Sequence, residues 1–233
     1  MTAASDPALL ALVGLRLASF APLPTVAARA GLSVAEATPL LEGLEARGLA
    51  RRRPRPSVND GEPVEAWSLT PDGRIEGERR CAAELDDLGL RPAVHDAYLR
   101  FLALNQPVLA VCTSWQVREV DGVPVPNDHA DPAYDADVVA ALEVLDVDAQ
   151  PVVEELGDLL ARFAGYGGRL AQALDLLRAG EGDWFTKPTI DSYHSIWFEL
   201  HEHLLATLGI ERSTEPVSPR ETNAPSRLQE STP

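Results

Sequence analysis

Apolar residues recur at helical spacing along most of the chain, in blocks separated by glycine, proline and polar clusters. The first 50 residues predict three helices. An apolar helix covers 9–20, a short one runs from Thr25 to Ala30, and an amphipathic one begins after Ser33. In the third helix the apolar residues Val34, Ala37, Leu40, Leu41 and Leu44 are three or four positions apart. This spacing buries one face and leaves the other exposed.

Two features define the start of the third helix, and one disturbs it. Ser33 followed three residues later by Glu36 forms a capping box, in which each side chain bonds a free backbone N–H of the other. Gly31 supplies the positive φ that a tight turn between the second and third helices needs. Pro39 removes a backbone hydrogen bond to Ala35 at a cost of roughly 3 kcal/mol, so we expect a bent helix.

After Gly48 the apolar pattern changes from helical to strand-like. Residues 49–53 and 65–69 predict two antiparallel strands. Between them, 54–63 contains Asn59-Asp60-Gly61, which is typical of the tip of a hairpin. The first strand carries consecutive arginines, and such side chains in this position are suited to neutralising DNA phosphates.

The stretch from Leu40 through Glu45-Ala46-Arg47-Gly48-Leu49-Ala50-Arg51 to Leu69-Thr70-Pro71-Asp72-Gly73-Arg74 resembles the MarR-like winged-helix transcriptional regulators. The resemblance implies a DNA-binding module over 7–74, with 33–47 as recognition helix and 51–55 as wing. Pro39 departs from the family pattern. The exposed half of the recognition helix lacks the Arg, Asn or Gln that reads a base through two hydrogen bonds. The expected DNA contacts are Thr25, Ser33, Ala35, Glu36, Thr38, Arg47, Arg51, Arg52, Arg53 and Arg55.

The remainder of the chain predicts helices and one long loop. A linking helix covers 75–90, and an all-helical domain for dimerisation and effector binding covers 91–212. Within it we expect breaks at 105–107 and 165–168, and separate helices over 135–145, 149–177 and 190–208. The loop 120–134 has no periodicity, which is typical of a functional or mobile segment. Residues 213–233 predict a disordered tail. The expected class is mainly α, with a winged helix-turn-helix of three helices and a two-stranded wing at the N-terminus.

Charge is divided unevenly along the chain, whose formal net charge is −16. Residues 1–80 hold ten arginines and ten acidic residues, whereas 81–233 hold ten basic and 26 acidic residues. An acidic domain behind a neutral, arginine-tipped module weakens non-specific DNA binding and still lets one face dock. The chain shows no membrane-length apolar run and no signal peptide, so we expect a cytoplasmic protein. Cys81 and Cys112 have no CxxC spacing, and we expect both to be buried and inert.

An aromatic and histidine-rich stretch covers 184–203 and allows two interpretations. It contains five of the chain's thirteen aromatic residues and three of its five histidines. The aromatic stripe is either ordinary core or the lining of a pocket for a small anionic effector. Candidate ligand-binding residues are Lys187, Tyr193, His194, Trp197 and His201. Lys187 is the only lysine in the chain. His194 and His201 are two turns apart, roughly 10 Å, so we assign no metal site; metal binding is the less favoured interpretation and needs a further ligand from Glu199, Glu202, His95 or Asp96.

An all-helical domain behind a winged helix broadly resembles the architecture of GntR-type effector domains, which often bind carboxylic acids and sometimes a metal. No residue roles are carried over. The leading hypothesis is a DNA-binding transcriptional regulator acting as a homodimer. The alternative is a protein–protein adaptor with a winged-helix fold that does not bind DNA specifically. Because the chain has no phosphate-binding glycine loop, HExxH motif or nucleophile elbow, we expect neither an enzyme nor a cofactor.

Overall fold

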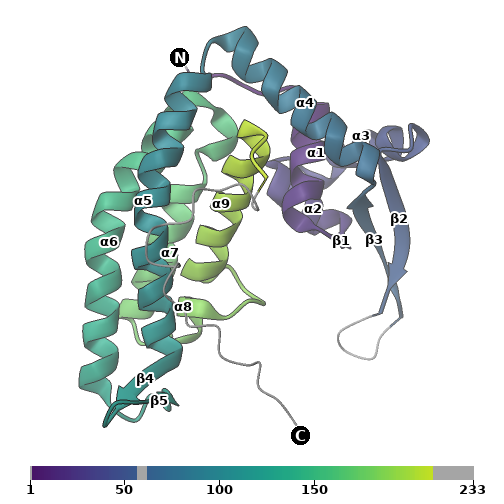
Figure 1. The fold of residues 1–233 in the computed structure, drawn as a ribbon. Coiled ribbons are helices and arrows are strands. Elements are labelled where there is room, and N and C mark those ends of the chain that lie inside the picture. The colour runs from purple at the N-terminus through teal and green to yellow at the C-terminus, as the bar shows by residue number, and fades with distance from the viewer. Residues whose placement is uncertain (1, 57–61, 212–233) are drawn as a thin grey trace, which may run out of the picture.

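The computed structural model describes residues 2–56 and 62–211, which are mainly helical with two small antiparallel sheets (Figure 1). The helices are α1 (Pro7–Ala18), α2 (Leu23–Ala30), α3 (Val34–Ala46), α4 (Pro71–Leu88), α5 (Arg91–Gln116), α6 (Pro132–Leu159), the 3-10 turn η1 (Ala161–Phe163), α7 (Tyr166–Arg178), α8 (Asp183–Thr186) and α9 (Tyr193–Leu208). The strands are β1 (Ala21–Pro22), β2 (Ala50–Arg55), β3 (Val64–Leu69), β4 (Val117–Val120) and β5 (Val123–Pro126). The predicted mainly helical class is confirmed.

The molecule has two parts joined by α4 (Figure 1). Helices α1, α2 and α3 and a three-stranded sheet form the smaller part, and α5, α6, α7 and α9 form a bundle beside it. Helix α4 runs from the smaller part to the start of α5. The linking helix therefore begins at Pro71, earlier than the predicted residue 75, because Thr70 caps it by accepting a hydrogen bond from the Gly73 amide at 3.0 Å.

The smaller part contains one strand that the sequence pattern did not predict. Strand β3 lies between β1 and β2, with Ala21 opposite Trp67 and Arg52 opposite Trp67 on the other side. The sheet therefore has three strands instead of the predicted two, because the two-residue β1 is too short to show a period. The predicted turn at 59–61 and the predicted tail at 213–233 lie outside the described residues.

Helix α3 begins as predicted. Gly31 has a φ of +66° at the end of α2, and both bonds of the capping box between Ser33 and Glu36 are present. The helix continues across Pro39 from Val34 to Ala46. Ala35, whose carbonyl loses its helical partner at Pro39, is exposed, so water can hydrogen-bond that oxygen.

The two longest helices also contain proline, and here the prediction of separate helices is wrong. Helix α5 continues through Pro107, and α6 continues through Pro151. Both prolines, and the residues Ala103 and Val147 four positions before them, are exposed. The carbonyls left unpaired by proline therefore lie on the solvent-exposed face of each helix, where water can replace the lost backbone hydrogen bond. The true break after α6 lies at 160–165, slightly before the predicted one.

The predicted loop at 120–134 contains a hairpin, so the second part is not all-helical. Strands β4 and β5 pair antiparallel, with Val120 opposite Val123. Asp121 and Gly122 form the tip with φ values of +52° and +79°, as a two-residue turn of positive φ requires. After the hairpin, Asn127 is buried and leads into α6.

The bundle has the larger hydrophobic core, which includes Phe101, Phe163, Phe185 and Trp197 at 1% exposure or less. Cys81 and Cys112 are buried as expected, and burial raises the thiol pKa values to about 11 and about 12. None of the helices in the described part of the chain has the length and apolarity needed to cross a bilayer.

Candidate functional site

The exposed face of α3 is partly occupied by its own cap. The Ser33 hydroxyl donates to Glu36 Oε2 at 2.6 Å, and the Ser33 amide donates to the same oxygen at 2.8 Å. Hydrogen bonds from the Ser33 side chain and backbone lower the pKa of Glu36, which keeps it anionic. Ser33 and Glu36 were predicted to face DNA bases, but here they bond each other. The Thr38 hydroxyl donates to the Val34 carbonyl at 2.7 Å, and Ala35 is exposed.

The arginines of β2 divide into two groups. Arg51 and Arg53 point to solvent, and the Arg51 Nε donates to Ser68 Oγ at 3.2 Å. Within the described residues Arg53 has no ion-pair partner. Arg47, at the end of α3, has a side chain that is 53% exposed, and its nearest carboxylate oxygen, on Glu76, is 3.9 Å away, which makes a weak pair. These three cations lie at the end of α3 and on the strand that follows it, and they remain available to an external anion.

The other predicted wing contacts, Arg52 and Arg55, have partners within the molecule. Arg52 lies over the Trp67 ring at 4.9 Å and pairs with Glu45 at 2.9 Å. Arg55 donates to the carbonyl of Phe20 at 3.3 Å. Thr25 lines a cavity together with His194 of α9, so the structure groups it with the bundle and not with the arginines of β2.

Three of the five predicted ligand-binding residues belong to the core. Trp197 donates from Nε1 to Asn105 Oδ1 at 3.0 Å and stacks on Phe101, and Tyr193 donates to Asp146 Oδ1 at 2.9 Å. His201 is 4% exposed and contacts the Phe101 ring. None of the three lines the cavities described here. For these residues the structure agrees with the core interpretation.

Lys187 and His194 do not share a site. Lys187 is exposed and pairs with Asp183 at 2.5 Å, whereas His194 is half-buried in the cavity lined by Thr25. Burial lowers the pKa of His194. The predicted grouping of these two residues with Tyr193 is therefore not formed. Among the described residues, no group of three or more histidine, cysteine and carboxylate side chains is placed to hold a metal ion.

The segment predicted as a functional loop holds one histidine in a fixed position. His129 has a φ of +57°, stacks on Trp115 with ring centres 4.5 Å apart, and lies with Nδ1 3.0 Å from Asp135 Oδ2. Both amide hydrogens of Asn127 are used, by the Trp115 carbonyl and by Asp135. His129 Nδ1 therefore carries the hydrogen that binds Asp135, which leaves Nε2 as an acceptor.

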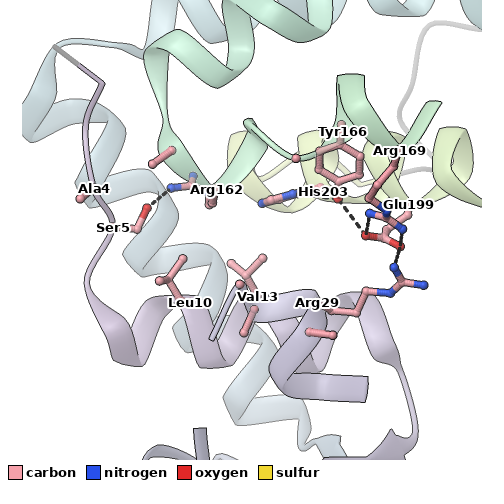
Figure 2. Close-up of a pocket in the computed structure, with 15 residues that line it drawn as sticks. Ala4, Ser5, Leu10, Val13, Arg29, Arg162, Tyr166, Arg169, Glu199 and His203 are labelled. Atoms are coloured by element: carbon pink, nitrogen blue, oxygen red, sulfur yellow. Dashed lines mark hydrogen bonds and ion pairs between the residues drawn. The ribbon is translucent and has the colours of Figure 1, made fainter. Parts of the chain in front are cut away.

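The two parts of the molecule meet in a cluster of ion pairs that no local pattern predicted. Glu199 of α9 accepts two bonds from Arg169 of α7, at 2.8 and 3.0 Å, and pairs with Arg29 of α2 at 3.0 Å. Asp191 pairs with the same two arginines, at 2.7 Å and 3.0 Å. Burial opposes ionisation of Asp191, but the hydrogen bonds and charges of the arginines outweigh it and lower its pKa. Helix α2 therefore contacts the bundle directly, through the ion pair of Arg29 with Glu199 (Figure 2).

A cavity of about 310 Å³ lies behind this cluster, between the two parts. In Figure 2, Arg162, His203, Tyr166 and Arg169 lie on the bundle side, opposite Leu10, Val13 and Arg29 of the smaller part. Residues Ala4 and Ser5 also line it, and Arg162 donates to Ser5 Oγ at 2.6 Å. The cavity is therefore built from segments far apart in the sequence.

The hydrogen bonds of Tyr166 fix the tautomer of His203. The Tyr166 hydroxyl donates to Glu199 Oε1 at 3.2 Å, and its oxygen lies 3.1 Å from His203 Nδ1. A hydroxyl has one hydrogen and Glu199 can only accept, so Nδ1 carries the hydrogen that binds the Tyr166 oxygen. His203 Nε2 is then an acceptor, and it is buried and has no hydrogen-bond partner within the described ranges 2–56 and 62–211. Arg162 Nε is a buried donor that likewise has no partner among these residues.

Mild acid is expected to destabilise the protein through His203. Burial, and then the positive charge of Arg162, lower its pKa well below the usual value. Below about pH 6.5 the imidazole binds a proton in the unfolded chain but not in the folded one. The free energy of unfolding therefore decreases as the pH is lowered, by up to about 1.4 kcal/mol per pH unit for one proton. Urea unfolding from about pH 7 to about pH 5 measures this slope. His203→Phe keeps the stacking on Phe163 and should reduce the slope of the free energy of unfolding against pH. The slope that remains comes from the half-buried His194, whose pKa is also lowered. Equal slopes in both proteins would contradict the assignment.

No family model matches this chain, and neither a curated protein nor a solved structure is significantly similar to it.

Proposed function

We propose that this protein is a DNA-binding transcriptional regulator whose smaller part docks on duplex DNA as a winged helix. The observation that carries the proposal is the group of exposed cations Arg47, Arg51 and Arg53, which lie at the end of α3 and on β2, the strand that follows it. Arginines in this arrangement can neutralise phosphates on either side of a groove that receives a helix. The order of α2, a tight turn, α3 and the β2–β3 hairpin supports the same proposal.

Binding of this kind would depend on the DNA backbone more than on base edges. The exposed N-terminal half of α3 offers the methyl of Ala35 and the hydroxyl of Thr38, and the carboxylate of Glu36 repels phosphate. Glu45 is neutralised by Arg52. We therefore propose a regulator of modest sequence selectivity, with most of its affinity from phosphate contacts.

A homodimer would strengthen such weak binding, because two modules on one DNA raise the local concentration of the second. Val144 and Val147 are 67% and 71% exposed and lie one turn apart on α6. We propose this face of the bundle as part of the contact between two copies. The molar mass by light scattering tests the proposal.

Replacing Arg51 and Arg53 with alanine together should weaken binding to all DNA sequences, roughly tenfold or more, and lower the slope of log affinity against log salt by about 1.8. Fluorescence anisotropy on the protein's own upstream DNA at several salt concentrations measures both effects. The matched control is Arg100→Ala with Arg178→Ala. These two exposed arginines lie on the bundle and pair with carboxylates, so DNA binding should not change. An unchanged slope in the β2 double variant would remove the β2 arginines from the interface.

The adaptor alternative is favoured by one observation, the acidic character of α3, whose exposed face carries Glu36 and Glu42. In that case the protein would show no salt-dependent DNA binding at all. The same anisotropy measurement at low salt therefore separates the two functions.

A further inference from the structure

The bundle contains a cavity of about 750 Å³ near the β4–β5 hairpin, which is within the size range of small-molecule sites in proteins. All the residues that line it belong to 115–135 and 180–187, so it is separate from the smaller part. We propose that this cavity binds a linear aliphatic diamine or polyamine in its protonated form. One ammonium group donates a hydrogen bond to His129 Nε2, and another pairs with the carboxylate of Glu181. This site is independent of DNA binding by the smaller part.

His129 is held in one orientation at the wall of this cavity. Its Nδ1 bonds Asp135, one face of its ring lies on Trp115, and its backbone amide donates to Asn127 Oδ1 at 3.2 Å. Asp135 is fixed in turn, because Asn127 donates to its other carboxylate oxygen at 2.8 Å. The side chain of His129 is nevertheless 42% exposed. The surface that remains open therefore includes the ring edge opposite Nδ1, which carries the acceptor Nε2.

Trp115 also lines the cavity, but neither face of its ring is open to a ligand. His129 lies on it with ring centres 4.5 Å apart, and Phe185 stacks on it at 4.6 Å. Because these two rings form no pair with each other within 2–56 and 62–211, they cover opposite faces of the indole. A quaternary ammonium ion, which is typically recognised by open aromatic faces, is therefore not the expected ligand.

Glu181 is held beside the same indole ring by the turn between α7 and α8. Its neighbour Gly182 packs so closely that a Cβ at this position would lie 3.1 Å from Trp115 Cζ2. Glu181 lines the cavity, and its exposed side chain has no ion-pair partner in the described part of the chain. A free carboxylate and the free imidazole nitrogen of His129 therefore line one cavity, and both are acceptors.

The charged groups of the cavity favour a ligand with two positive charges. Three carboxylates and one ammonium group line it, which leaves two negative charges unbalanced. Lys187 neutralises Asp183, with which it forms an ion pair. Asp135 binds the neutral imidazole of His129 and so keeps its charge, and Glu181 keeps its own. A molecule with two ammonium groups matches both the charge and the two acceptors, through charge-assisted hydrogen bonds.

The acidic surface of the bundle attracts every cation to some degree, since residues 81–233 include ten basic and 26 acidic residues. Specific binding is distinguished by the hydrogen bond to His129, which needs an N–H donor on the ligand. A divalent metal ion is not the expected occupant, because no three histidine, cysteine and carboxylate side chains of the described ranges are grouped to hold one.

The direct test is nitrogen NMR of the histidine side chains in the full wild-type chain. At about pH 8 and about 0.15 M salt an ordinary imidazole is neutral, alkylamines are protonated and diffuse attraction is screened. The probes are putrescine and spermidine. The comparison compounds are butanediol, succinate and permethylated putrescine, which carries the same two charges without N–H groups. At least one amine should move the Nε2 resonance of His129 saturably, and none of the comparison compounds should.

Calorimetry on three variants shows where the amine binds. His129→Asn removes Nε2 and introduces a residue type that tolerates the φ of +57°, so binding should weaken at least about tenfold. Glu181→Gln removes one charge from an exposed side chain and should weaken binding about tenfold. The matched control is Asp137→Asn, which removes one charge from an exposed residue of α6 outside the cavity and should change binding less than about twofold.

The site is overturned if neither amine moves the Nε2 resonance of His129. It is also overturned if permethylated putrescine binds as tightly as putrescine, or if Asp137→Asn weakens binding as much as Glu181→Gln. Either result would show only diffuse attraction of cations to the acidic surface. The NMR measurement uses the wild-type protein, so it does not depend on the folding of a variant. No DNA is present, so a negative result leaves the proposed DNA-binding function untouched.

Discussion

Replacing Trp197 with alanine is expected to lower the free energy of unfolding by about 3–5 kcal/mol, because a buried aromatic side chain is lost and the core closes only partly around the space. The Trp197 ring is 1% exposed and stacks on Phe101 with ring centres 4.4 Å apart. The change also removes the indole N–H that donates to the side-chain oxygen Oδ1 of Asn105 at 3.0 Å. Asn105 is itself buried, so this oxygen is left without that donor in the core. Urea unfolding followed by circular dichroism measures the loss.

Two further variants show whether packing or the hydrogen bond causes the effect. Trp197→Phe keeps an aromatic ring on Phe101 but loses the donor and a smaller part of the buried ring than alanine does, so it should cost about 1–3 kcal/mol. Phe198→Ala changes the next residue, whose side chain is 52% exposed, and should cost less than about 1 kcal/mol. If Trp197→Ala leaves stability unchanged but abolishes binding of a small anion, Trp197 lines an effector pocket and the core interpretation is wrong.

The parts of the fold that could be predicted from sequence are those controlled by neighbouring residues. The capping box of Ser33 and Glu36 involves a three-residue separation, and the positive φ of Gly31 is a property of one residue. The two strands of the β2–β3 hairpin were predicted within two residues of their bounds for the same reason. The β4–β5 hairpin has an equally local signal, Asp121-Gly122 between valines, but its four-residue strands are too short to show a period.

Proline effects could not be predicted because they depend on what surrounds the helix. The prediction of a break at Pro107 assumed that the lost hydrogen bond ends a helix, and the same kind of bond is lost at Pro151 inside α6. In the structure each lies on an exposed face where water can bind the unpaired carbonyl, and packing of α5 against α6 holds both helices together. The same sequence signal on a buried face would have ended the helix.

The cavity between the two parts could not be predicted because its residues are separated by long stretches of chain. Ser5, Arg29, Arg162 and His203 belong to four different segments. Their spacing follows no motif, and each alone is typical of a surface or core residue. The arginines of β2 were different, because consecutive residues already placed them together, although the sequence did not show that Arg52 stacks on Trp67.

The second large effect is expected at Glu199, where α2, α7 and α9 meet. Replacing Glu199 with alanine leaves Arg29 and Arg169 without their shared carboxylate, although Asp191 still pairs with both. Removing one partner of a buried pair typically costs about 3–5 kcal/mol, and the arginines are about a quarter exposed, so we expect about 2–4 kcal/mol. Tyr166 also loses the acceptor of its hydroxyl.

The location of Glu199 makes a second result specific to this residue. Arg29 belongs to the smaller part and Arg169 to the bundle, so the loss should loosen the contact between them, and thermal unfolding should broaden or separate into two transitions. Arg29→Ala should cost less, because Arg169 keeps both bonds to Glu199. The control is Glu143→Ala, which breaks an exposed pair with Arg178 within the bundle and should have no measurable effect. A single sharp transition and unchanged stability in Glu199→Ala would mean that apolar packing of α1 against α4 and α9 joins the two parts without help from the ion pairs.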